Sequence, residues 1–501
     1  MKAAAVFSDN MVLQRGVPVR VFGTCEDVCG DIYVSVPEMG ISAKASVNNG
    51  RWSALLPAAS ACRSCTLEIT SDIRRIVFRN VAYGEVWLAG GQSNMQFELR
   101  NDKDGISALK NCHKENVRYY NTPKCSYYGE DMKRAESRSC WTLPSEEGSG
   151  EWSAAGYYFA AELSRRLGVT VGIIGCNWGG TSASAWVSED VLSRDSRLAV
   201  YLDDYDKAVE GKSEEQMTAE YLEYTATRNK WIEKVVACMN EKGLRWGEAS
   251  ALCGEDPYPG PMGHLHPERP CGLYSTMLRR IAPYTVRGVL WYQGESDDHH
   301  PEVYYPLLTS LIGLWRTMWH NDSLPFIIAQ LPVYGEEGHE TDTSWSLIRE
   351  AQMKAYETVR NTGLAVLLDC GEFGNIHPID KAPVGHRMYL QALSEVYSLA
   401  DRKDTLPPVY SHVECGEDEL RVYFDNMYGV RTETGWASGF AIADADGEFF
   451  PADEAEFDGC GVLHLKSHFV KYPVCVRYLW NNYAEVKLFG VNGLPIPPFR
   501  S

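Results

Sequence analysis

The chain has 501 residues, of which 45% are hydrophobic and 11% aromatic, so it is a folded globular protein of several domains and not a disordered one. Its formal net charge of −19 argues against nucleic acid or an anionic membrane as a partner, although a local pocket can still be basic. No apolar run reaches the roughly 18 residues that a membrane helix needs. The apolar stretch at residues 1–7 is too short for a signal peptide.

The 15 cysteines are odd in number and scattered over the whole chain, which favours reduced thiols and a cytoplasmic location. Cys25, Cys29, Cys62 and Cys65 have a spacing that could hold zinc, but they lie between strand-like segments without other ligand types nearby. We therefore expect no metal and no other cofactor.

Residues 1–82 show the pattern of a small β domain. Short alternating segments recur there, and turn residues such as Asn48-Asn49-Gly50 separate them. The expected strands are 17–23, 31–36 and 65–70, with another that starts near Trp52. This series predicts a sandwich-like N-terminal domain.

The stretch from Val81 to Leu99 carries an apolar run that ends in Gly90-Gly91 and continues as Gln92-Ser93-Asn94-Met95. A short apolar run closed by glycines is typical of a buried strand that enters a tight turn. A serine at that point stands at the carboxyl end of a strand, where open α/β sheets bind ligands. Ser93 is therefore a candidate nucleophile, and capping of the next helix is the alternative role. Met95 replaces the second glycine of the G-x-S-x-G elbow, which argues against an α/β-hydrolase fold.

Residues 83–404 alternate between strand and helix, which predicts a mostly parallel sheet with helices on both faces. The expected strands are 86–89, 169–174, 286–292, 326–330 and 364–369, and the expected helices are 157–167, 304–319, 345–359 and 384–399. The charged segment 198–245 is expected to be a helical insertion, and the proline-rich segment 254–272 a loop.

After about residue 405 the β pattern returns. The expected strands are 420–424, 439–442, 462–465 and 475–480, so residues 405–501 are predicted to form a C-terminal β domain.

Four of the predicted strands are followed by polar groups suited to acyl transfer: Ser93, Gly179-Gly180-Thr181, Gln293-Gly294-Glu295, and His377. The carboxyl ends of parallel strands meet at one edge of a sheet, so we expect these groups to lie together. Acyl transfer needs a hydroxyl, an imidazole base and donors for the tetrahedral oxyanion, and these positions offer each of them.

The sequence resembles the sialate O-acetylesterases, a family within the wider SGNH or GDSL-like hydrolases. The resemblance covers nearly the whole chain and rests on motifs that combine GQSNM, WYQGES and IHP. These motifs are DNMVLQR at 9–15, GEVWLAGGQSNM at 84–95, GVLWYQGESD at 288–297, WSLIREAQ at 345–352, NIHPIDKAPVGHR at 375–387 and GLPIPPFR at 493–500.

The resemblance implies that Ser93 is the nucleophile and that His377 is the general base and acid. It also implies an oxyanion hole made of the N–H groups of Ser93 and Gly180 and the side chain of Gln293. Glu295 is expected to brace its loop more than to react.

Further residues are candidates for substrate binding: Asn177, Trp178, Glu295 and Arg349. Arg349 could pair with a sialate carboxylate, and a structural ion pair is the alternative.

The chain departs from the family where many relatives have an aspartate two or three residues before the histidine. Gly374 and Asn375 stand there. An asparagine can accept a hydrogen bond from the imidazole, but it supplies no negative charge. The alternatives are a Ser–His dyad steered by Asn375 or by a backbone carbonyl, and a triad completed by Asp369 or Glu372.

The sequence thus predicts a metal-independent carbohydrate O-acetylesterase that acts on an O-acetylated sugar through an acetyl-Ser93 intermediate. A sialate O-acetylesterase is expected first, and an esterase for acetylated xylo- or manno-oligosaccharides is the alternative. A catalytically silent carbohydrate-binding protein is the alternative from another class. The oligomeric state stays open.

Overall fold

The computed structural model describes residues 1–25, 30–339 and 342–501. The chain forms two compact units, Met1–Ser296 with Pro306–Leu324, and Asp297–Tyr305 with Pro325–Ser501. The mixed α/β class is confirmed. The domain boundaries predicted at 82/83 and 404/405 fall within two continuous elements, the strand β9 (Arg75–Gly91) and the helix α13 (Arg402–Thr405).

The strands of the first unit are β1 (Lys2–Ala3), β2 (Val12–Gln14), β3 (Val19–Thr24), β4 (Tyr33–Val36), β5 (Ile41–Lys44), β6 (Ser46–Asn48), β7 (Arg51–Leu56), β8 (Cys62–Thr70), β9, β10 (Val117–Asn121), β11 (Trp141–Thr142), β12 (Val171–Asn177) and β13 (Gly288–Tyr292). Its helices are α1 (Ser93–Gln96), α2 (Gly105–Asn111), α3 (Glu130–Arg138), α4 (Ala154–Leu167), α5 (Glu189–Arg194), α6 (Val200–Val209), α7 (Glu214–Lys242), α8 (Trp246–Leu252), α9 (Arg279–Ile281) and, apart from its start, α10 (Tyr304–Met318).

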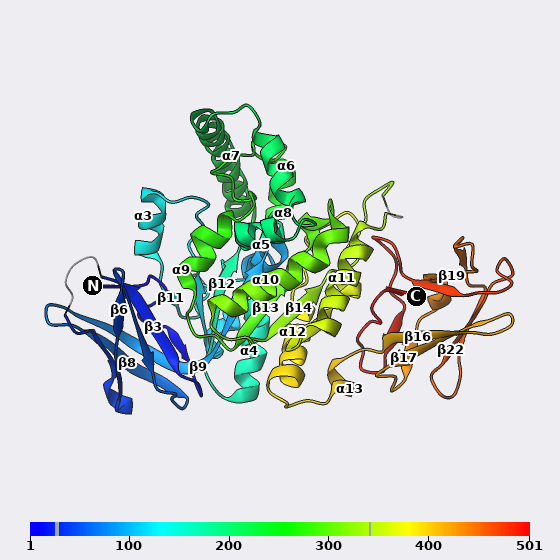
Figure 1. The fold of residues 1–501 in the computed structure, drawn as a ribbon, viewed down its shortest axis with the longest axis horizontal. Helices are drawn as coiled ribbons and strands as arrows, with labels where there is room; N and C mark the ends of the chain where they lie inside the picture. The colour runs from blue at the N-terminus through cyan, green and yellow to red at the C-terminus, as the bar shows by residue number, and fades with distance from the viewer. Residues whose placement is uncertain (26–29, 340–341) are drawn as a thin grey trace. The chain divides into compact units, whose positions relative to one another are not determined.

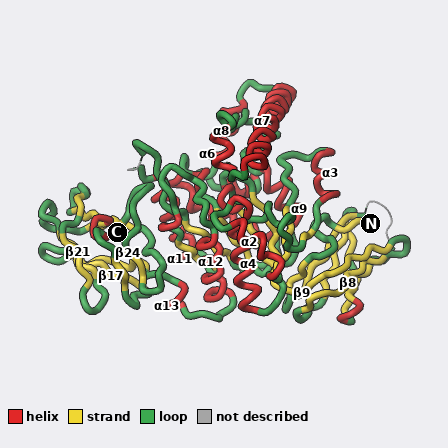
Figure 2. Tube along the Cα trace, turned by 180° about the vertical axis from the view of Figure 1, so that it is seen from behind, coloured by secondary structure: helices red, strands yellow, loops and turns green. Residues whose placement is uncertain are grey.

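The long strand β9 belongs to two kinds of sheet. Its first part pairs antiparallel with β8, and the two strands lie side by side in Figure 2. Its last part is the centre of a parallel sheet, with β12 on one side and β13 on the other. The order β10-β12-β9-β13 is continued by β11, which is antiparallel to β10. The single strand β9 therefore connects the N-terminal antiparallel strands to the parallel sheet, and Ser93 follows its carboxyl end.

Helices cover both faces of this parallel sheet, as predicted. Side chains alternate between the faces of a strand, so Trp87 and Gly90 of β9 face opposite ways. The Trp87 ring packs against Phe159 of α4 with the ring centres 5.0 Å apart. On the other face, a Cβ added at Gly90 would lie 3.0 Å from the ring of Trp315 of α10.

The predicted insertion is helical. The helices α6 and α7 project from the rest of the first unit (Figure 1). α7 starts with a capping box between Ser213 and Gln216 and ends at Gly243, which is left-handed with φ 65°. Trp231 and Val235 of α7 form a small core with Ala249 of α8, so the arm is held by packing as well as by helix propensity.

The second unit contains the strands β14 (Phe326–Gln330), β15 (Thr362–Val366), β16 (Val409–Cys415), β17 (Leu420–Asp425), β18 (Val430–Thr432), β19 (Phe440–Ala443), β20 (Phe450–Pro451), β21 (Glu454–Phe457), β22 (Leu463–Lys466), β23 (Cys475–Tyr478), β24 (Leu488–Gly490) and β25 (Phe499–Arg500). Its helices are α11 (Ser344–Thr358), α12 (Ala382–Gln391) and α13. β14 and β15 are parallel and pack against α11 and α12, whereas the later strands form small antiparallel sheets.

The C-terminal strands of the second unit are tied to α11. The side-chain oxygen of Asn482 accepts from the N–H of Trp345 at 2.9 Å, and its backbone carbonyl accepts from the N–H of Tyr334 at 3.0 Å. Arg500 in the closing motif donates two hydrogen bonds of 2.8 Å to the Glu350 carboxylate. The motifs at 345–352 and 493–500 thus meet in space.

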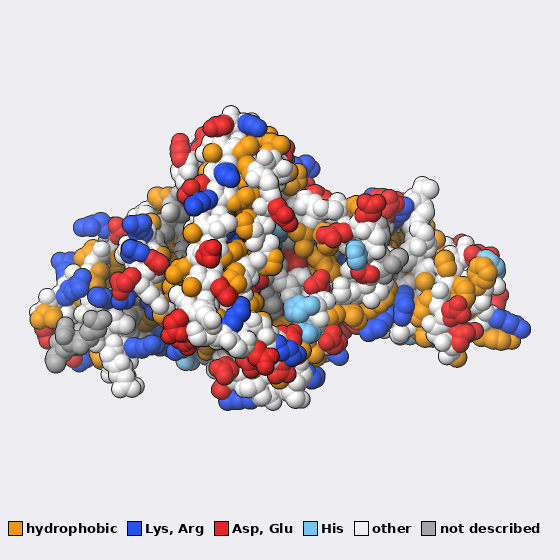
Figure 3. All heavy atoms as spheres, turned by 90° about the horizontal axis from the view of Figure 1, so that it is seen from above, with side chains coloured by type: hydrophobic (Ala, Val, Ile, Leu, Met, Phe, Trp, Pro, Cys, Tyr) orange, Lys and Arg blue, Asp and Glu red, His pale blue; other side chains and the backbone are white. Residues whose placement is uncertain are grey.

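Cys25 is disulfide-bonded, contrary to the expectation of thiols throughout, and Cys29 lies outside the described residues. Cys62 and Cys65 are free. No helix among the described residues is long and apolar enough to cross a membrane. Acidic and basic side chains are interspersed on the face drawn in Figure 3.

A buried carboxylate joins the opening motif to the central sheet. Glu85 of β9 has no exposed side-chain surface, and it accepts hydrogen bonds from Arg15 (2.7 Å), Arg287 (3.0 Å) and Gln14 (3.0 Å). Burial acts to raise the pKa of Glu85, but the hydrogen bonds and charges of these partners outweigh it and hold the pKa below its usual range.

We predict that Glu85→Gln lowers the free energy of unfolding by about 3 kcal/mol, because two arginines lose their buried counter-ion. Since the folded pKa is lowered, this stabilisation is present above the usual carboxyl pKa and is lost as the pH falls through the lowered value. Urea unfolding at pH 7 and at pH 4 measures both effects.

Glu68→Gln is the matched control, since Glu68 pairs with an Arg75 whose side chain is 63% exposed. Its effect should be about 0.5 kcal/mol or less. Equal effects of the two substitutions would contradict the role of Glu85.

Candidate active site

Ser93 lies at the turn between β9 and α1. The turn needs glycine at Gly91, which has φ 135° and whose Cβ would lie 2.0 Å from the carbonyl oxygen of Tyr292. Ser93 is partly exposed, although Gln92 and Asn94 on either side are 2% and 1% exposed. Within the described part of the first unit the Ser93 hydroxyl has no hydrogen-bond partner. The turn thus presents one accessible hydroxyl from a buried frame.

Gln92 fixes this turn to the loop that follows β13. Its side-chain oxygen accepts from the N–H of Ser296 at 3.2 Å, from the N–H of Gly294 at 3.4 Å and from the Gln293 amide at 3.1 Å. Its side-chain nitrogen donates to the Ser296 hydroxyl at 3.1 Å. The GQSNM and WYQGES motifs are therefore joined through one side chain.

Gln293 and Glu295 are parts of the same frame. Gln293 is fully buried, and its amide nitrogen donates to Gln92 and, at 3.3 Å, to the carbonyl of Thr181. Both of its N–H bonds point at protein acceptors, so to act as an oxyanion donor, as the resemblance implies, Gln293 would have to release one of them. Glu295 accepts from Asn94 at 2.6 Å and is 5% exposed, which fits the expected brace rather than substrate binding.

The Gly179-Gly180 segment follows β12 and lies against the serine. A Cβ added at Gly179 would be 3.2 Å from the Cβ of Ser93, and the Gly179 N–H donates to Gln96 of α1 at 2.8 Å. Gly180 has φ 78°, a conformation that favours glycine. Both glycines are partly exposed, so their backbone is open beside the candidate nucleophile.

A pocket of about 300 Å³ lies next to the end of α1 and the end of β12. Its lining includes Gln96 of α1, Asn177 at the end of β12 and Lys124. Asn177, a candidate for substrate binding, is 7% exposed, and its amide donates to the carbonyl of Ala89 at 3.1 Å. Trp178 follows it and is partly exposed.

Sequence reasoning missed Lys124. Its side chain is exposed overall and lines the pocket, where partial burial lowers its pKa to about 8 against the opposing charges of Glu98 and Glu151. Both carboxylates also pair with Arg100, at 2.7 and 3.7 Å. A lone lysine in the segment after a strand was the only signal in the sequence.

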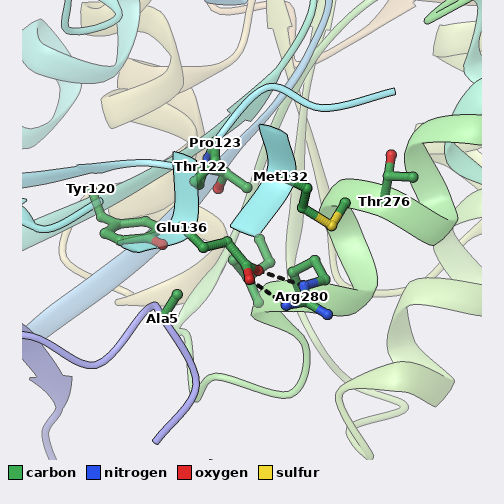
Figure 4. A pocket seen from close by; sticks show the side chains of 9 residues that line it. Ala5, Tyr120, Thr122, Pro123, Met132, Glu136, Thr276 and Arg280 are labelled. Atoms are coloured by element: carbon green, nitrogen blue, oxygen red, sulfur yellow. Dashed lines mark hydrogen bonds and ion pairs between the residues drawn. The ribbon is translucent and has the colours of Figure 1, made fainter. Parts of the chain in front are cut away.

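The helix α3 lines part of this pocket, and contacts with α9 hold its other side in place. A small cavity of about 10 Å³, room for about one water molecule, lies between α3 and α9. Figure 4 shows Glu136 of α3 and Arg280 of α9 facing each other there, joined by two hydrogen bonds of 2.6 and 2.5 Å.

His377 lies in the second unit, on a loop braced by Glu372. One carboxylate oxygen of Glu372 accepts from the N–H of Ile379 at 3.0 Å, and the other accepts from the Asn375 amide at 2.8 Å. Burial, aided by the positive charge of Lys381, lowers the pKa of His377 to about 4. The imidazole is therefore neutral at pH 7, which is the form that a base requires.

Asn375 bonds to the backbone of the same loop. Its side-chain oxygen accepts from the backbone N–H of His377 at 3.0 Å, so this contact orients the loop. Asp369 forms a two-pronged ion pair with Arg387, at 2.5 and 2.8 Å, and is thus occupied structurally. Glu372 is occupied by the loop itself.

Arg349 is buried in the second unit. It has no exposed surface, and its guanidinium donates to the carbonyls of Pro332 (3.1 Å), Asn481 and Asn482 (3.4 Å) and to the hydroxyl of Ser346 (3.2 Å). It therefore binds neither a substrate carboxylate nor a carboxylate partner by these contacts, but anchors the C-terminal chain to α11. The sequence could not reveal this, because three of the four acceptors are backbone carbonyls.

Comparison with known proteins agrees with the resemblance seen in the motifs. Residues 265–377 match a family model described as a carbohydrate esterase, sialic acid-specific acetylesterase. The sialate O-acetylesterase of Rattus norvegicus is 24% identical over 473 residues, covering 87% of this chain and 80% of the relative. That of Mus musculus is 25% identical over 464 residues, covering 84% and 77%.

A solved structure resembles the whole chain. The crystal structure of a carbohydrate acetylesterase from Xanthomonas citri superposes with a TM-score of 0.76 at 27% identity, covering 100% of this chain and 99% of that one. The similarity predicted from the motifs is confirmed.

We predict that the imidazole of His377 titrates near pH 4, below the roughly 6.5 of an unperturbed histidine. The cause is that burial and the charge of Lys381 both disfavour the imidazolium. NMR titration of selectively labelled histidines measures the value, and His377→Gln identifies the signal by its loss. A midpoint near 6.5 would show that the ring is hydrated or paired with an anion.

Proposed function

We propose that this chain, which is related over most of its length to sialate O-acetylesterases, is a carbohydrate O-acetylesterase that works through an acetyl-serine intermediate. The observation that carries the proposal is Ser93: one accessible hydroxyl in a buried turn, beside partly exposed glycine backbone. Carbohydrate esterase relatives make the ester of a sugar the natural substrate class.

The proposed reaction has two halves. In the first, the Ser93 oxygen attacks the acetyl carbonyl while His377 takes its proton, and the N–H groups of Ser93 and Gly180 stabilise the oxyanion. The carbonyl then re-forms, the bond to the sugar oxygen breaks, and His377 returns the proton to that oxygen. In the second half, a water molecule activated by His377 attacks the acetyl-Ser93 and releases acetate.

Finer points of the architecture are part of the same proposal. The catalytic sheet is taken as an SGNH-type sheet, and the terminal β regions as sandwich-like domains. The helices on both faces of the parallel sheet and the antiparallel pairings at the two ends support this assignment.

A sialate is the preferred substrate within this class. With Arg349 buried, a cation suited to the sialate carboxylate is Lys124, which lines, together with Arg138, a pocket large enough for a sugar ring. Its pKa of about 8 keeps it mostly charged at pH 7. Acetylated xylo- or manno-oligosaccharides remain the second candidate, since they share the ester but lack the carboxylate.

We predict that Ser93→Ala lowers kcat on p-nitrophenyl acetate by about a thousandfold or more, because covalent catalysis is lost. Circular dichroism serves as the control for folding. Wild-type turnover in the variant would remove Ser93 from the mechanism. An inactive wild-type protein that still binds acetylated sugars would instead support a silent binding protein.

We predict that Lys124→Met raises KM for an O-acetylated sialoglycan by about tenfold, as expected for a lost charge-assisted hydrogen bond. The KM for acetylated xylan or mannan oligosaccharides should stay unchanged. Acetate release from each substrate measures both.

Lys133→Met is the matched control, because Lys133 lies on the exposed side of α3 and pairs with Glu130. A loss shared by charged and neutral sugars would show that Lys124 does not recognise a carboxylate.

A further inference from the structure

The loop that returns from the helical insertion reaches the Gly179-Gly180 corner. A Cβ added at Gly180 would lie 2.5 Å from the hydroxyl oxygen of Tyr258 and 2.6 Å from Oε1 of Glu268. The two side-chain oxygens therefore lie where the Cβ of any other residue would be. The neighbouring Gly179 lies against Ser93. A side chain at this position would displace two polar groups, and the φ of 78° at Gly180 also favours glycine.

This pair is positioned by the arm behind it. Arg228 of α7 donates to both oxygens of Asp256, at 3.1 and 3.2 Å, and its guanidinium lies 5.3 Å from the centre of the Tyr258 ring. The N–H of Glu268 donates to Nδ1 of His266 at 3.2 Å. The arm and the loop thus hold Tyr258 and Glu268 as a preformed unit.

The pair is accessible and not part of a core. Tyr258 is 43% exposed, and Glu268 and Gly180 are partly exposed. Burial raises the pKa of Glu268 to about 7, against the hydrogen bond from Tyr258 and the charge of Arg228. Near neutral pH the carboxyl group therefore both donates and accepts hydrogen bonds, as does the tyrosine hydroxyl. Sugar hydroxyl groups need partners of this kind.

The loop is also joined to the segment that carries Lys124. The Ser126 hydroxyl donates to the carbonyl of Leu265, and Arg269 donates to the carbonyl of Ser126 at 3.2 Å. A ring whose ester lies at Ser93 would therefore meet two connected loops, one with an ammonium group and one with a hydroxyl-binding pair.

We propose that Glu268 and Tyr258 are specificity-determining residues that bind hydroxyl groups of the sugar ring next to the acetyl ester, which makes the insertion a substrate-binding arm. This inference rests on the proposed esterase function. It adds the residues by which the enzyme would discriminate sugar esters from simple acetate esters. No element of the mechanism above requires either side chain.

The test compares a sugar ester with an ester that has no ring hydroxyls. We would measure kcat and KM for Glu268→Ala, Glu268→Gln and Tyr258→Phe on p-nitrophenyl acetate and on O-acetylated N-acetylneuraminic acid, acetylated xylo-oligosaccharide and acetylated manno-oligosaccharide. Glu268→Ala and Tyr258→Phe should each lower kcat/KM on the best sugar ester by about tenfold, mainly through KM. Glu268→Gln, which still donates and accepts, should recover part of the loss, and p-nitrophenyl acetate should be hydrolysed as by the wild type.

Glu255→Gln is the matched control, because Glu255 is an exposed carboxylate of the same loop. It should leave all substrates unaffected. Equal losses of Glu268→Ala on sugar esters and p-nitrophenyl acetate would show that the pair only supports the Gly180 corner, and would overturn the inference while the esterase function stands. Unchanged kinetics of Glu268→Ala and Tyr258→Phe on sugar esters would also overturn the inference, and the esterase function would again stand. A wild-type protein inactive on every ester would overturn the proposed function and this inference together.

Discussion

The side chain of Gln92 is the contact on which the nucleophile turn depends. β9 ends in a backbone conformation that only glycine adopts easily. Beyond the backbone hydrogen bonds of the turn, the Gln92 side chain bonds to two backbone N–H groups of the loop at 293–296. A buried amide with four satisfied bonds is rigid, because each bond broken in a dry interior leaves an unpaired polar group. The accessible position of Ser93 follows from that rigidity.

Electrostatics in this acidic chain are local. The overall charge says nothing of the pocket lined by Lys124, which also contains Glu98 and Glu151, two carboxylates that are already paired with Arg100. Burial disfavours the charged form of each of these groups. It lowers the pKa of His377 and of Lys124, and it raises the pKa of Glu268. The groups that meet the proposed substrate are therefore close to changing charge near neutral pH, or neutral already.

Much of the fold could be predicted because buried strands and capped helices leave local patterns. The helix predicted at 157–167 is α4, extended by three residues to the Ser153 cap. β10 was missed because Arg118 interrupts its apolar pattern, and that arginine is buried by donating to the backbone carbonyls of Asn10 and Asn80. The boundary predicted at 82/83 falls inside β9, since a change of sheet partner within one strand leaves no mark in composition.

The site was predictable only as a set of residue types. Ser93 and the glycines could be identified because they follow predicted strands, and the turn residues that close a strand can be recognised in the sequence. What Arg349, Asn375 and Gln293 contact was not predictable, since their partners are backbone groups or amides brought together from distant segments. The pKa of His377 depends on burial in the folded loop, a quantity that no spacing of residues contains.

The contacts between α11 and the C-terminal chain limit how the gene of this protein could have arisen by fusion or recombination. Asn482 completes the start of α11, and Arg349 of α11 is solvated by carbonyls of the chain at 481–482. A gene fusion that supplied the C-terminal strands as an independent cassette would deprive this buried guanidinium of two of its acceptors, the carbonyls of Asn481 and Asn482. Exchange of that region between relatives by recombination should therefore succeed only when α11 travels with it, so the two segments are expected to have been inherited as one piece.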